Sequence, residues 1–159
     1  MRIISGVAKG RRLVAPGTPA TRPVTDRVRE AVFSIIGAWV EGARVLDLYA
    51  GTGSFGLEAL SRGAAAATFV EQGYSARDAL RANVRSVSLG GTVVNSSVRD
   101  FLERSGASYD LVFVDPPWDM PSAQLGTDLA ALDRLVSADG EVVLSRRQGD
   151  DAPASPPGW

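Results

Sequence analysis

Short apolar runs alternate along the whole chain with segments in which apolar residues recur every three or four positions. A continuous apolar run of this kind is typical of a buried strand, whereas the wider spacing is typical of an amphipathic helix. The apolar runs predict strands at 43–50, 66–71, 91–97, 109–115 and 140–147. The helical spacing predicts helices at 25–39, 54–63, 75–90, 98–106 and 121–140, the first capped by Thr25 and the last frayed near Gly126.

Strands that alternate with helices predict an α/β fold, in which a mostly parallel, doubly wound sheet carries helices on both faces. Ahead of this pattern, residues 2–16 read as two short strands around a glycine turn, a β-hairpin extension. The tail at 149–159 is polar and rich in proline, as loops are. We therefore expect a basic N-terminal hairpin or arm at 1–22 and one main domain at 23–159.

Composition narrows the chemistry, because the 159 residues include no cysteine and no histidine. Disulfides, Cys/His zinc sites, a cysteine nucleophile and a Ser-His-Asp triad are thereby excluded, and we expect no metal. The N-terminus lacks the apolar stretch of a secretory signal, and no apolar run approaches the ~20 residues that span a bilayer. We therefore expect a cytoplasmic protein without membrane contact.

The net charge of -1 conceals an asymmetry between the two ends of the chain. Residues 1–30 hold seven basic and two acidic side chains, and the remainder carries a net charge of -6. A basic arm on an acidic body predicts contact with a polyanion at one end. The plainer alternative is a solvated charged face.

A glycine-rich loop follows the first predicted strand of the main domain. Gly51, Gly53 and Gly56 form a GxGxxG pattern between strand and helix, and Glu71 stands twenty residues after Gly51 at the end of the next strand. Such glycines let the backbone approach a nucleotide closely, and the acid can accept the hydroxyls of a ribose. The alternative is a tight turn with close packing of the helix on the sheet.

The pattern alone would also suit a nicotinamide dinucleotide, but Asp47 argues against it. A carboxylate four residues before Gly51 would repel a pyrophosphate and attract a cation, such as an ammonium or sulfonium group. A ligand with an adenosine ribose at one end and a cationic amino acid at the other is S-adenosylmethionine. After the third strand, Ser97 and Val98 are the residues placed to contact its adenine, with Asp100 as a less favourable alternative.

The stretch DPPW at 115–118 follows the fourth predicted strand. Proline fixes its own φ and holds the preceding residue extended, so this loop is stiff. If the Asp115 carboxylate and the Pro116 carbonyl each accept one hydrogen of a nucleobase amine, its nitrogen lone pair can point at an activated methyl group. Trp118 would stack the base. The alternative is a proline turn with the tryptophan packed over the core.

Five segments in this order resemble the bacterial ribosomal small-subunit methyltransferase D (RsmD) family: RIISGVAKGRRL, RPVTDRVREAVFSII, VLDLYAGTGSFGLEALSRGA, FVE and FVDPPW. The resemblance implies a Rossmann-like class I methyltransferase fold, S-adenosylmethionine as cofactor, and a guanine N2 amine of 16S rRNA as the methyl acceptor. It also implies 16S rRNA or an assembling 30S subunit as the partner of what we expect to be a monomer.

Carried onto this sequence, the resemblance implies three sets of site residues. The catalytic set is Asp115, Pro116, Pro117 and Trp118. The cofactor set is Asp47, Tyr49, Ala50, Gly51, Thr52, Gly53, Glu71, Gln72, Ser97, Val98 and Asp115. The RNA set is Arg2, Lys9, Arg11, Arg12, Arg22, Thr25, Arg27 and Arg29, with Asp26 helping to cover the site.

The chain departs from the family at four places. Trp118 replaces a tyrosine or phenylalanine, Ser97 stands where an acid or asparagine is frequent, and Gln72 stands where another acid is frequent. We would also expect a final pair of strands beyond 147; without them the strand at 140–147 is an exposed edge. Two alternatives therefore stay open, an RNA-binding module that has lost activity and, less favoured, a nicotinamide-dependent oxidoreductase.

Overall fold

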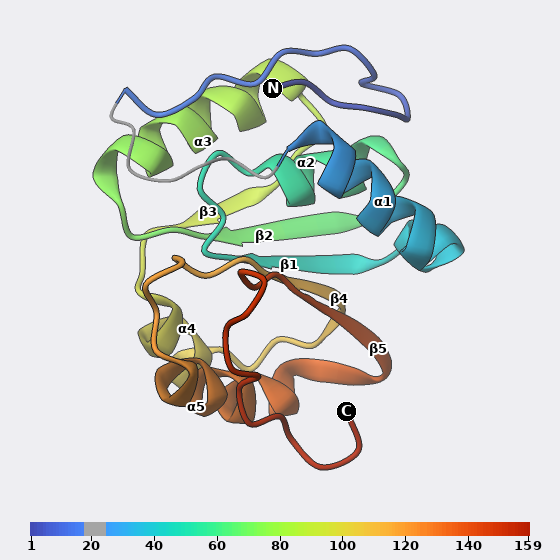
Figure 1. The fold of residues 1–159 in the computed structure, drawn as a ribbon. Coiled ribbons are helices and arrows are strands. Elements are labelled where there is room, and N and C mark those ends of the chain that lie inside the picture. Colours follow the sequence, from blue (N-terminus) through green and yellow to red (C-terminus); the bar gives the residue numbers. More distant parts are fainter. Residues whose placement is uncertain (18–24) are drawn as a thin grey trace.

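The computed structural model describes residues 1–17 and 25–159, which form one parallel five-stranded sheet covered by helices (Figure 1). The strands are β1 (Arg44–Leu48), β2 (Ala66–Val70), β3 (Thr92–Val94), β4 (Tyr109–Val114) and β5 (Val136–Leu144). They lie in the order β3-β2-β1-β4-β5, and every neighbouring pair is parallel. The expectation of a parallel, doubly wound sheet is confirmed.

The helices divide between the two faces of the sheet (Figure 1). One face carries α1 (Asp26–Ile36), α2 (Ser54–Ser61) and α3 (Tyr74–Val87), and the other carries α4 (Val98–Arg104) and α5 (Ser122–Leu132). The chain leaves β1 toward β2 and β3, then crosses back to β4, so strand order reverses between β1 and β4. None of the helices among the described residues has the length and apolar character needed to cross a membrane.

Both faces of the sheet are packed, which explains why the strands read as continuous apolar runs. Along β1, Val45 belongs to the apolar cluster under α1–α3, and the next residue, Leu46, belongs to the cluster under α4 and α5. The first cluster is centred on aromatic side chains, with the rings of Phe55 and Phe113 stacked at a centroid distance of 4.8 Å.

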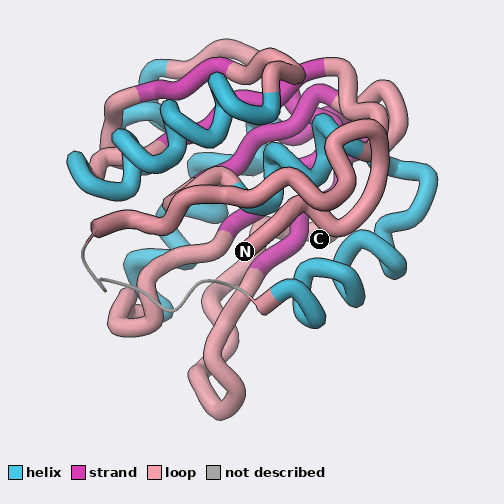
Figure 2. Tube along the Cα trace, turned by 90° about the horizontal axis from the view of Figure 1, so that it is seen from above, coloured by secondary structure: helices cyan, strands magenta, loops and turns pink. Residues whose placement is uncertain are grey.

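The N-terminal segment forms a short hairpin, in which Arg2 and Arg12 make an antiparallel bridge and no longer strand is formed within residues 1–17. The Ile3 N–H donates to the Arg11 carbonyl at 2.9 Å, and the Leu13 N–H donates to the Met1 carbonyl at 3.0 Å. It lies over α2 and α3 on the side away from the sheet (Figures 1 and 2). Ile3 and Leu13 are buried in the core, and the Glu58 carboxylate of α2 accepts hydrogen bonds from the backbone of residues 4 and 5 at 2.7 and 3.0 Å. The segment is therefore fastened to the main body.

Two expectations about the C-terminal third were wrong. The helix expected at 121–140 ends at Leu132, and after one 3-10 turn β5 already begins at Val136, which pairs with Tyr109 of β4. Gly126 does not fray α5. It is buried in mid-helix, and a Cβ there would lie 3.3 Å from backbone atoms of Ala154, so the glycine lets the tail pack against the helix.

The tail after β5 folds back over α5 and adds no strand within the described residues. The Ser122 hydroxyl donates to the carbonyl of Asp151 at 2.9 Å, and the Trp159 indole N–H donates to Asp133 at 2.8 Å. β5 therefore remains an edge strand of the described sheet, paired only with β4, as expected from the sequence.

Candidate functional site

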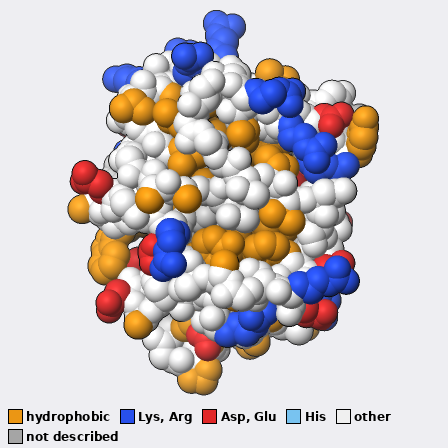
Figure 3. Space-filling view, turned by 180° about the vertical axis from the view of Figure 1, so that it is seen from behind, with side chains coloured by type: hydrophobic (Ala, Val, Ile, Leu, Met, Phe, Trp, Pro, Cys, Tyr) orange, Lys and Arg blue, Asp and Glu red, His pale blue; other side chains and the backbone are white. Residues whose placement is uncertain are grey.

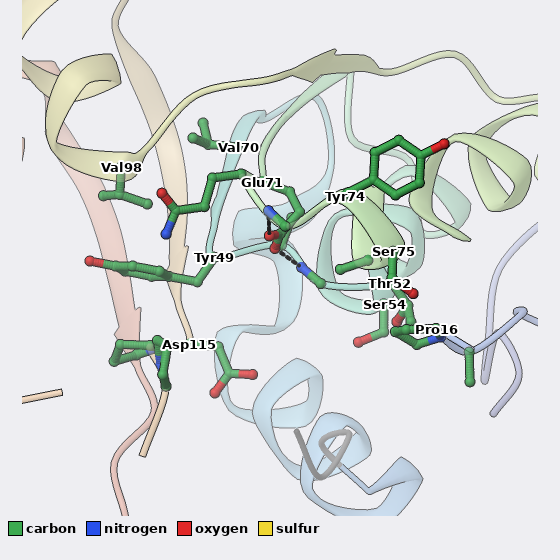
Figure 4. A pocket seen from close by; sticks show the side chains of 18 of the residues that line it. Pro16, Tyr49, Thr52, Ser54, Val70, Glu71, Tyr74, Ser75, Val98 and Asp115 are labelled. Carbon is green, nitrogen blue, oxygen red and sulfur yellow. Dashed lines mark hydrogen bonds between the residues drawn. The ribbon is translucent and has the colours of Figure 1, made fainter. Parts of the chain in front are cut away.

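A cavity of about 750 Å³ opens at the carboxyl ends of the strands, where strand order reverses (Figure 4). Ligands of doubly wound sheets bind at this place, because the loops that follow neighbouring strands diverge there. The walls come from the loops after the first four strands and from the N-terminal segment. They consist of Met1, Ala15, Pro16, Gly17, Tyr49, Ala50, Gly51, Thr52, Ser54, Val70, Glu71, Gln72, Gly73, Tyr74, Ser75, Ala76, Ser96, Val98, Asp115, Pro116, Pro117 and Trp118.

The three glycines of the GxGxxG loop have different tasks. Gly51 lines the cavity with a φ of +55°, and a Cβ there would meet only the carbonyl oxygen of Tyr49 at 3.9 Å, so its surface is open to a ligand. A Cβ on Gly53 would lie 2.4 Å from Leu80, and one on Gly56 would lie 2.4 Å from the Phe69 ring. The close-packing alternative therefore holds for the second and third glycines, and only the first faces the cavity.

Glu71 joins the glycine loop to the end of β2. Its two carboxylate oxygens accept hydrogen bonds from the backbone N–H groups of Gly51 at 2.9 Å and Gly73 at 2.6 Å, which Figure 4 marks with dashed lines. The side chain is half-buried and lines the cavity. Each carboxylate oxygen can accept a second hydrogen bond, so Glu71 holds the loop in shape and keeps acceptor capacity for a ligand hydroxyl.

The structure does not place Asp47 in the cavity wall, although the sequence predicts it as a cofactor contact. Its side chain is 1% exposed and accepts a hydrogen bond from the Gly56 N–H at 2.9 Å. Burial raises the pKa of Asp47 well above its usual value, the Gly56 bond opposes this rise, and the charges of Asp115 and Glu71 add to it. Asp47 thus lies beneath the glycine loop and is not a contact residue of the cavity.

The four residues of DPPW all line the cavity. Burial raises the pKa of Asp115, and a hydrogen bond from the Ser145 side chain works in the opposite direction. Trp118 is 56% exposed, which excludes the alternative in which this ring packs over the core. An accessible aromatic face therefore stands beside a partly desolvated carboxylate.

The charged side chains of the cavity wall are acidic. Among its described lining residues the only charged side chains are Glu71 and Asp115, and none is basic. A dinucleotide pyrophosphate would need basic groups or several free N–H donors, whereas a cationic ligand is attracted by such acids. The site chemistry thus fits a ligand with a positive group.

Tyr49 lines the cavity from the end of β1 with a φ of 58°, an uncommon backbone conformation for a bulky residue. Its hydroxyl donates to Asp128 of α5 at 2.8 Å, and Asp128 in turn pairs with Arg99 of α4 at 3.2 Å. Burial, followed by the bond to Asp128, raises the pKa of Tyr49 far above its usual value. The Tyr49 ring is therefore held in place by α5, which covers the face of the sheet opposite to α1–α3.

The loop after β3 differs by one residue from the expectation. Ser97 does not line the cavity, because its hydroxyl caps α4 by accepting the Asp100 N–H at 3.1 Å. Its neighbours Ser96 and Val98 line the cavity, while Asp100 is exposed outside it. Of the remaining predicted cofactor contacts, Ala50, Thr52 and Gln72 lie in the wall and Gly53 does not.

Arg29 requires a correction, because the structure excludes it from the exposed RNA-binding set. Its side chain is 0% exposed, donates to Asp26 at 2.9 Å and to the carbonyl of Arg2, and lies 3.9 Å from Glu58. The guanidinium joins α1 to the N-terminal segment and to α2. The predicted RNA contacts that are exposed are Arg2, Lys9, Arg11, Arg12, Thr25 and Arg27, whereas Arg22 lies outside the described residues.

Sequence reasoning missed several parts of the wall, among them Ser54, Val70 and Gly73. Met1 and residues 15–17 reach the cavity only because the N-terminal segment folds over α2 and α3, which no local pattern indicates. Residues 74–76, at the start of α3, follow Glu71 so closely that their position after β2 could have indicated them.

Comparisons with known proteins agree with the geometry. The family model described as "Conserved hypothetical protein 95" matches residues 1–159. Ribosomal RNA small subunit methyltransferase D of Escherichia coli is 44% identical over 119 residues, which cover 74% of this chain and 60% of that protein. The Bacillus subtilis protein YlbH is 33% identical over 160 residues, covering 96% of this chain and 86% of its own length.

Solved structures show the same fold. The structure of the Escherichia coli protein yhhF superimposes with a TM-score of 0.88 at 35% identity, covering 100% of this chain and 87% of that chain. The Thermus thermophilus protein TTHA0928 gives a TM-score of 0.86 at 35% identity, covering 96% of this chain and 90% of that chain. The five-stranded sheet is thus that of a Rossmann-like class I methyltransferase.

Proposed function

Since the chain belongs to the RsmD family, the family of ribosomal RNA small subunit methyltransferase D, we propose that it methylates rRNA. More finely, we propose transfer of a methyl group from S-adenosylmethionine to the N2 amine of a guanine in 16S rRNA. The observation that carries the proposal is a cavity whose charged side chains are acidic, with the Gly51–Glu71 loop on one side and DPPW on the other.

The residues present fit S-adenosylmethionine. Gly51 offers open backbone surface, and Glu71 keeps acceptor capacity for the ribose hydroxyls. Val70 and Val98 supply an apolar wall of the kind that an adenine requires. Glu71 and Asp115 would attract the cationic methionine end of the cofactor. The bound cofactor would supply a methyl group activated by its positive sulfur.

Asp115 and Pro116 act on the acceptor amine in this proposal. The carboxylate and the proline carbonyl each accept one amine hydrogen, which frees the nitrogen lone pair from the base ring. Because burial raises the pKa of Asp115, its carboxylate binds a proton more strongly than an exposed aspartate and can receive the one that the amine loses. Pro117 stiffens the loop, and stacking on Trp118 contributes ~1–3 kcal/mol.

The exposed basic residues of the N-terminal segment would bind RNA phosphates in this proposal, as would Arg27 at the start of α1. We propose 1–22 as an RNA-binding arm and 23–159 as the catalytic domain of a monomer. Its partner would be 16S rRNA or an assembling 30S subunit, which would place the protein in the cytoplasm. Such phosphate contacts make affinity strongly dependent on salt.

The test is transfer of a tritiated methyl group to under-methylated 30S particles. We expect Asp115→Ala to lower the rate by about 100-fold or more, because it removes a contact made in the transition state, while binding of S-adenosylmethionine by calorimetry is largely kept. Asp119→Ala removes a neighbouring exposed carboxylate outside the cavity and serves as control. A wild-type rate in Asp115→Ala would overturn the assigned role.

This chain spans about 60% of the length of the E. coli relative. One alternative function rests on Ser97, which caps α4 and does not line the cavity where a polar contact to the cofactor adenine was expected. An RNA-binding module without activity would bind 30S particles and leave them unlabelled. The same assay with the wild-type chain separates the two functions, because binding without methyl transfer would favour the module.

A further inference from the structure

The N-terminal segment brings the basic side chain of Arg11 against α3, which is far away in the sequence. The Val14 N–H donates to the Asn83 side chain at 2.7 Å, and the Asn83 amide donates back to the Val14 carbonyl at 3.0 Å. The Arg11 guanidinium donates to the carbonyl of Ser86, in the last turn of α3, at 3.1 Å. A basic residue near the start of the chain therefore lies beside α3 of the main domain.

That helix is itself basic. Arg77, Arg81 and Arg85 follow one another at four-residue intervals, so they lie near one another along the helix, and Arg81 and Arg85 are exposed. Asp78 is the only acid of α3, and residues 1–17 contain four basic side chains and no acid. Figure 3 shows several Lys and Arg side chains in the upper part of the molecule, where Figure 1 places this segment and α3, and others in the lower half.

The basic surface is continuous with the cavity through Tyr74. This first residue of α3 lines the cavity and is nevertheless 73% exposed (Figure 4). The Arg77 guanidinium lies 5.7 Å from the centre of the Tyr74 ring. From Tyr74, α3 leads away from the cavity mouth over its 14 residues, a length of about 21 Å.

We propose that the α3–arm surface, defined as Arg11, Arg12, Arg81 and Arg85, binds the phosphate backbone of the substrate RNA, with Tyr74 as a stacking face for a base at the cavity rim. The inference rests on the proposed function, which makes RNA the ligand of the adjacent cavity. The planar guanidinium of an arginine can donate two hydrogen bonds to one phosphate. Aromatic rings stack on nucleobases without regard to sequence. An accessible aromatic between arginines and a cavity favours a single-stranded nucleic acid.

The test measures binding of a labelled, unmodified 16S rRNA transcript by Arg81→Gln, Arg85→Gln and the double variant. Glutamine keeps the straight side chain and helix propensity but removes the charge. Arg104→Gln is the control, because it removes one exposed charge from α4 on the opposite face of the sheet. A thermal melt by circular dichroism verifies that each variant is folded.

We expect the double variant to bind about tenfold more weakly at low salt, and its slope of log K against log salt to fall by about 1.4, the value for two single-strand phosphate contacts. The control is expected to retain wild-type affinity. Equal affinity and slope in the double variant and in Arg104→Gln would overturn the inference.

Methyl transfer is measured in parallel to separate this surface from the proposed function. In the double variant we expect a higher KM for RNA with kcat retained at saturating RNA. If the wild-type chain binds RNA but transfers no methyl group, the proposed function fails, and the binding data still decide for or against the surface. A wild-type chain that does not bind rRNA overturns both.

Discussion

At the scale of single residues, Asp47 shows how an acid that was expected in the site stabilises the fold instead. The N-cap position of α2 is Gly53, which has no side chain to accept the free N–H groups of the first turn. The Asp47 carboxylate takes over this task from the neighbouring strand by accepting the Gly56 N–H. The acid is therefore drawn beneath the glycine loop and away from the cavity surface.

The buried charge of Asp47 predicts a pH-dependent stability. Because burial raises its pKa above 3.8, the native state binds this proton more tightly than the unfolded state does, and stability falls as pH rises from 3.8 through the folded pKa. Asparagine can still accept the Gly56 N–H but carries no charge. We therefore expect Asp47→Asn to raise the free energy of unfolding at pH 7, measured in urea without cofactor.

The pH series itself provides the control for this variant. The difference between Asp47→Asn and wild type is expected to shrink as pH falls and to become constant well below pH 3.8, where Asp47 is protonated in both the folded and the unfolded state. A difference that is constant from pH 3 to pH 7 would show that the charge of Asp47 has no part in it.

At the scale of elements, the contact of α2 with β2 depends on a missing side chain. A Cβ on Gly56 would meet three ring atoms of Phe69 within 3.1 Å, and Phe69 is fully buried. We expect Gly56→Ala to lower the free energy of unfolding by about 1–2 kcal/mol in urea titrations, because the strain of overpacking exceeds the gain in helix propensity.

Gly106→Ala is the matched control, since a Cβ at this exposed loop position would meet nothing within 4 Å. This variant is expected to be as stable as wild type or about 0.4–1 kcal/mol more stable, through the lower entropy of the unfolded chain. Equal stability of Gly56→Ala and Gly106→Ala would contradict the close-packing role of Gly56.

Elements were predicted well from the sequence where the hydrophobic period was clear, and less well at their ends. The Thr25 cap of α1 is confirmed, as its hydroxyl accepts the Val28 N–H at 3.3 Å. The end of α5 was missed because Leu132 and Leu135 continue the helical spacing and both are buried. Leu132 is the last residue of α5, whereas Leu135 ends the 3-10 turn that follows it. Pairing of Val136 with β4 decides where the helix stops.

At the scale of the whole molecule, the cavity chemistry predicts which ligand stabilises the fold. A ligand that binds only the native state at a hundred times its Kd adds about 2.7 kcal/mol, which for a chain of this size raises Tm by about 5–10 °C. We expect such a rise with S-adenosylmethionine or its demethylated product. No rise is expected with NAD, because the described cavity wall has no basic side chain to bind a pyrophosphate.

Differential scanning calorimetry with each ligand measures this shift. Methionine and adenosine, supplied separately, serve as controls for the two ends of the cofactor. A larger rise with NAD than with S-adenosylmethionine would favour the oxidoreductase alternative and contradict the charge argument.

The sequence by itself determined the order of strands and helices along the chain and the parallel, doubly wound sheet. It also determined the two loops that line the cavity, the glycine loop after β1 and the DPPW loop after β4. These features follow from local periodicity and from residues adjacent in the chain, such as Gly51 and the stretch 115–118. Which residues end up inside, and which distant segments meet, was decided only by the tertiary structure.

Arg29 is the clearest case of a residue whose environment only the tertiary structure decided. The sequence predicts an exposed basic residue at this position, yet the folded N-terminal segment buries Arg29, which donates to the Arg2 carbonyl and lies 3.9 Å from the buried Glu58. The cavity wall at residues 15–17 and the joining of the arm to α3 have the same origin. Contacts between residues that are far apart in the sequence depend on how whole elements pack, and no local pattern of the chain records them.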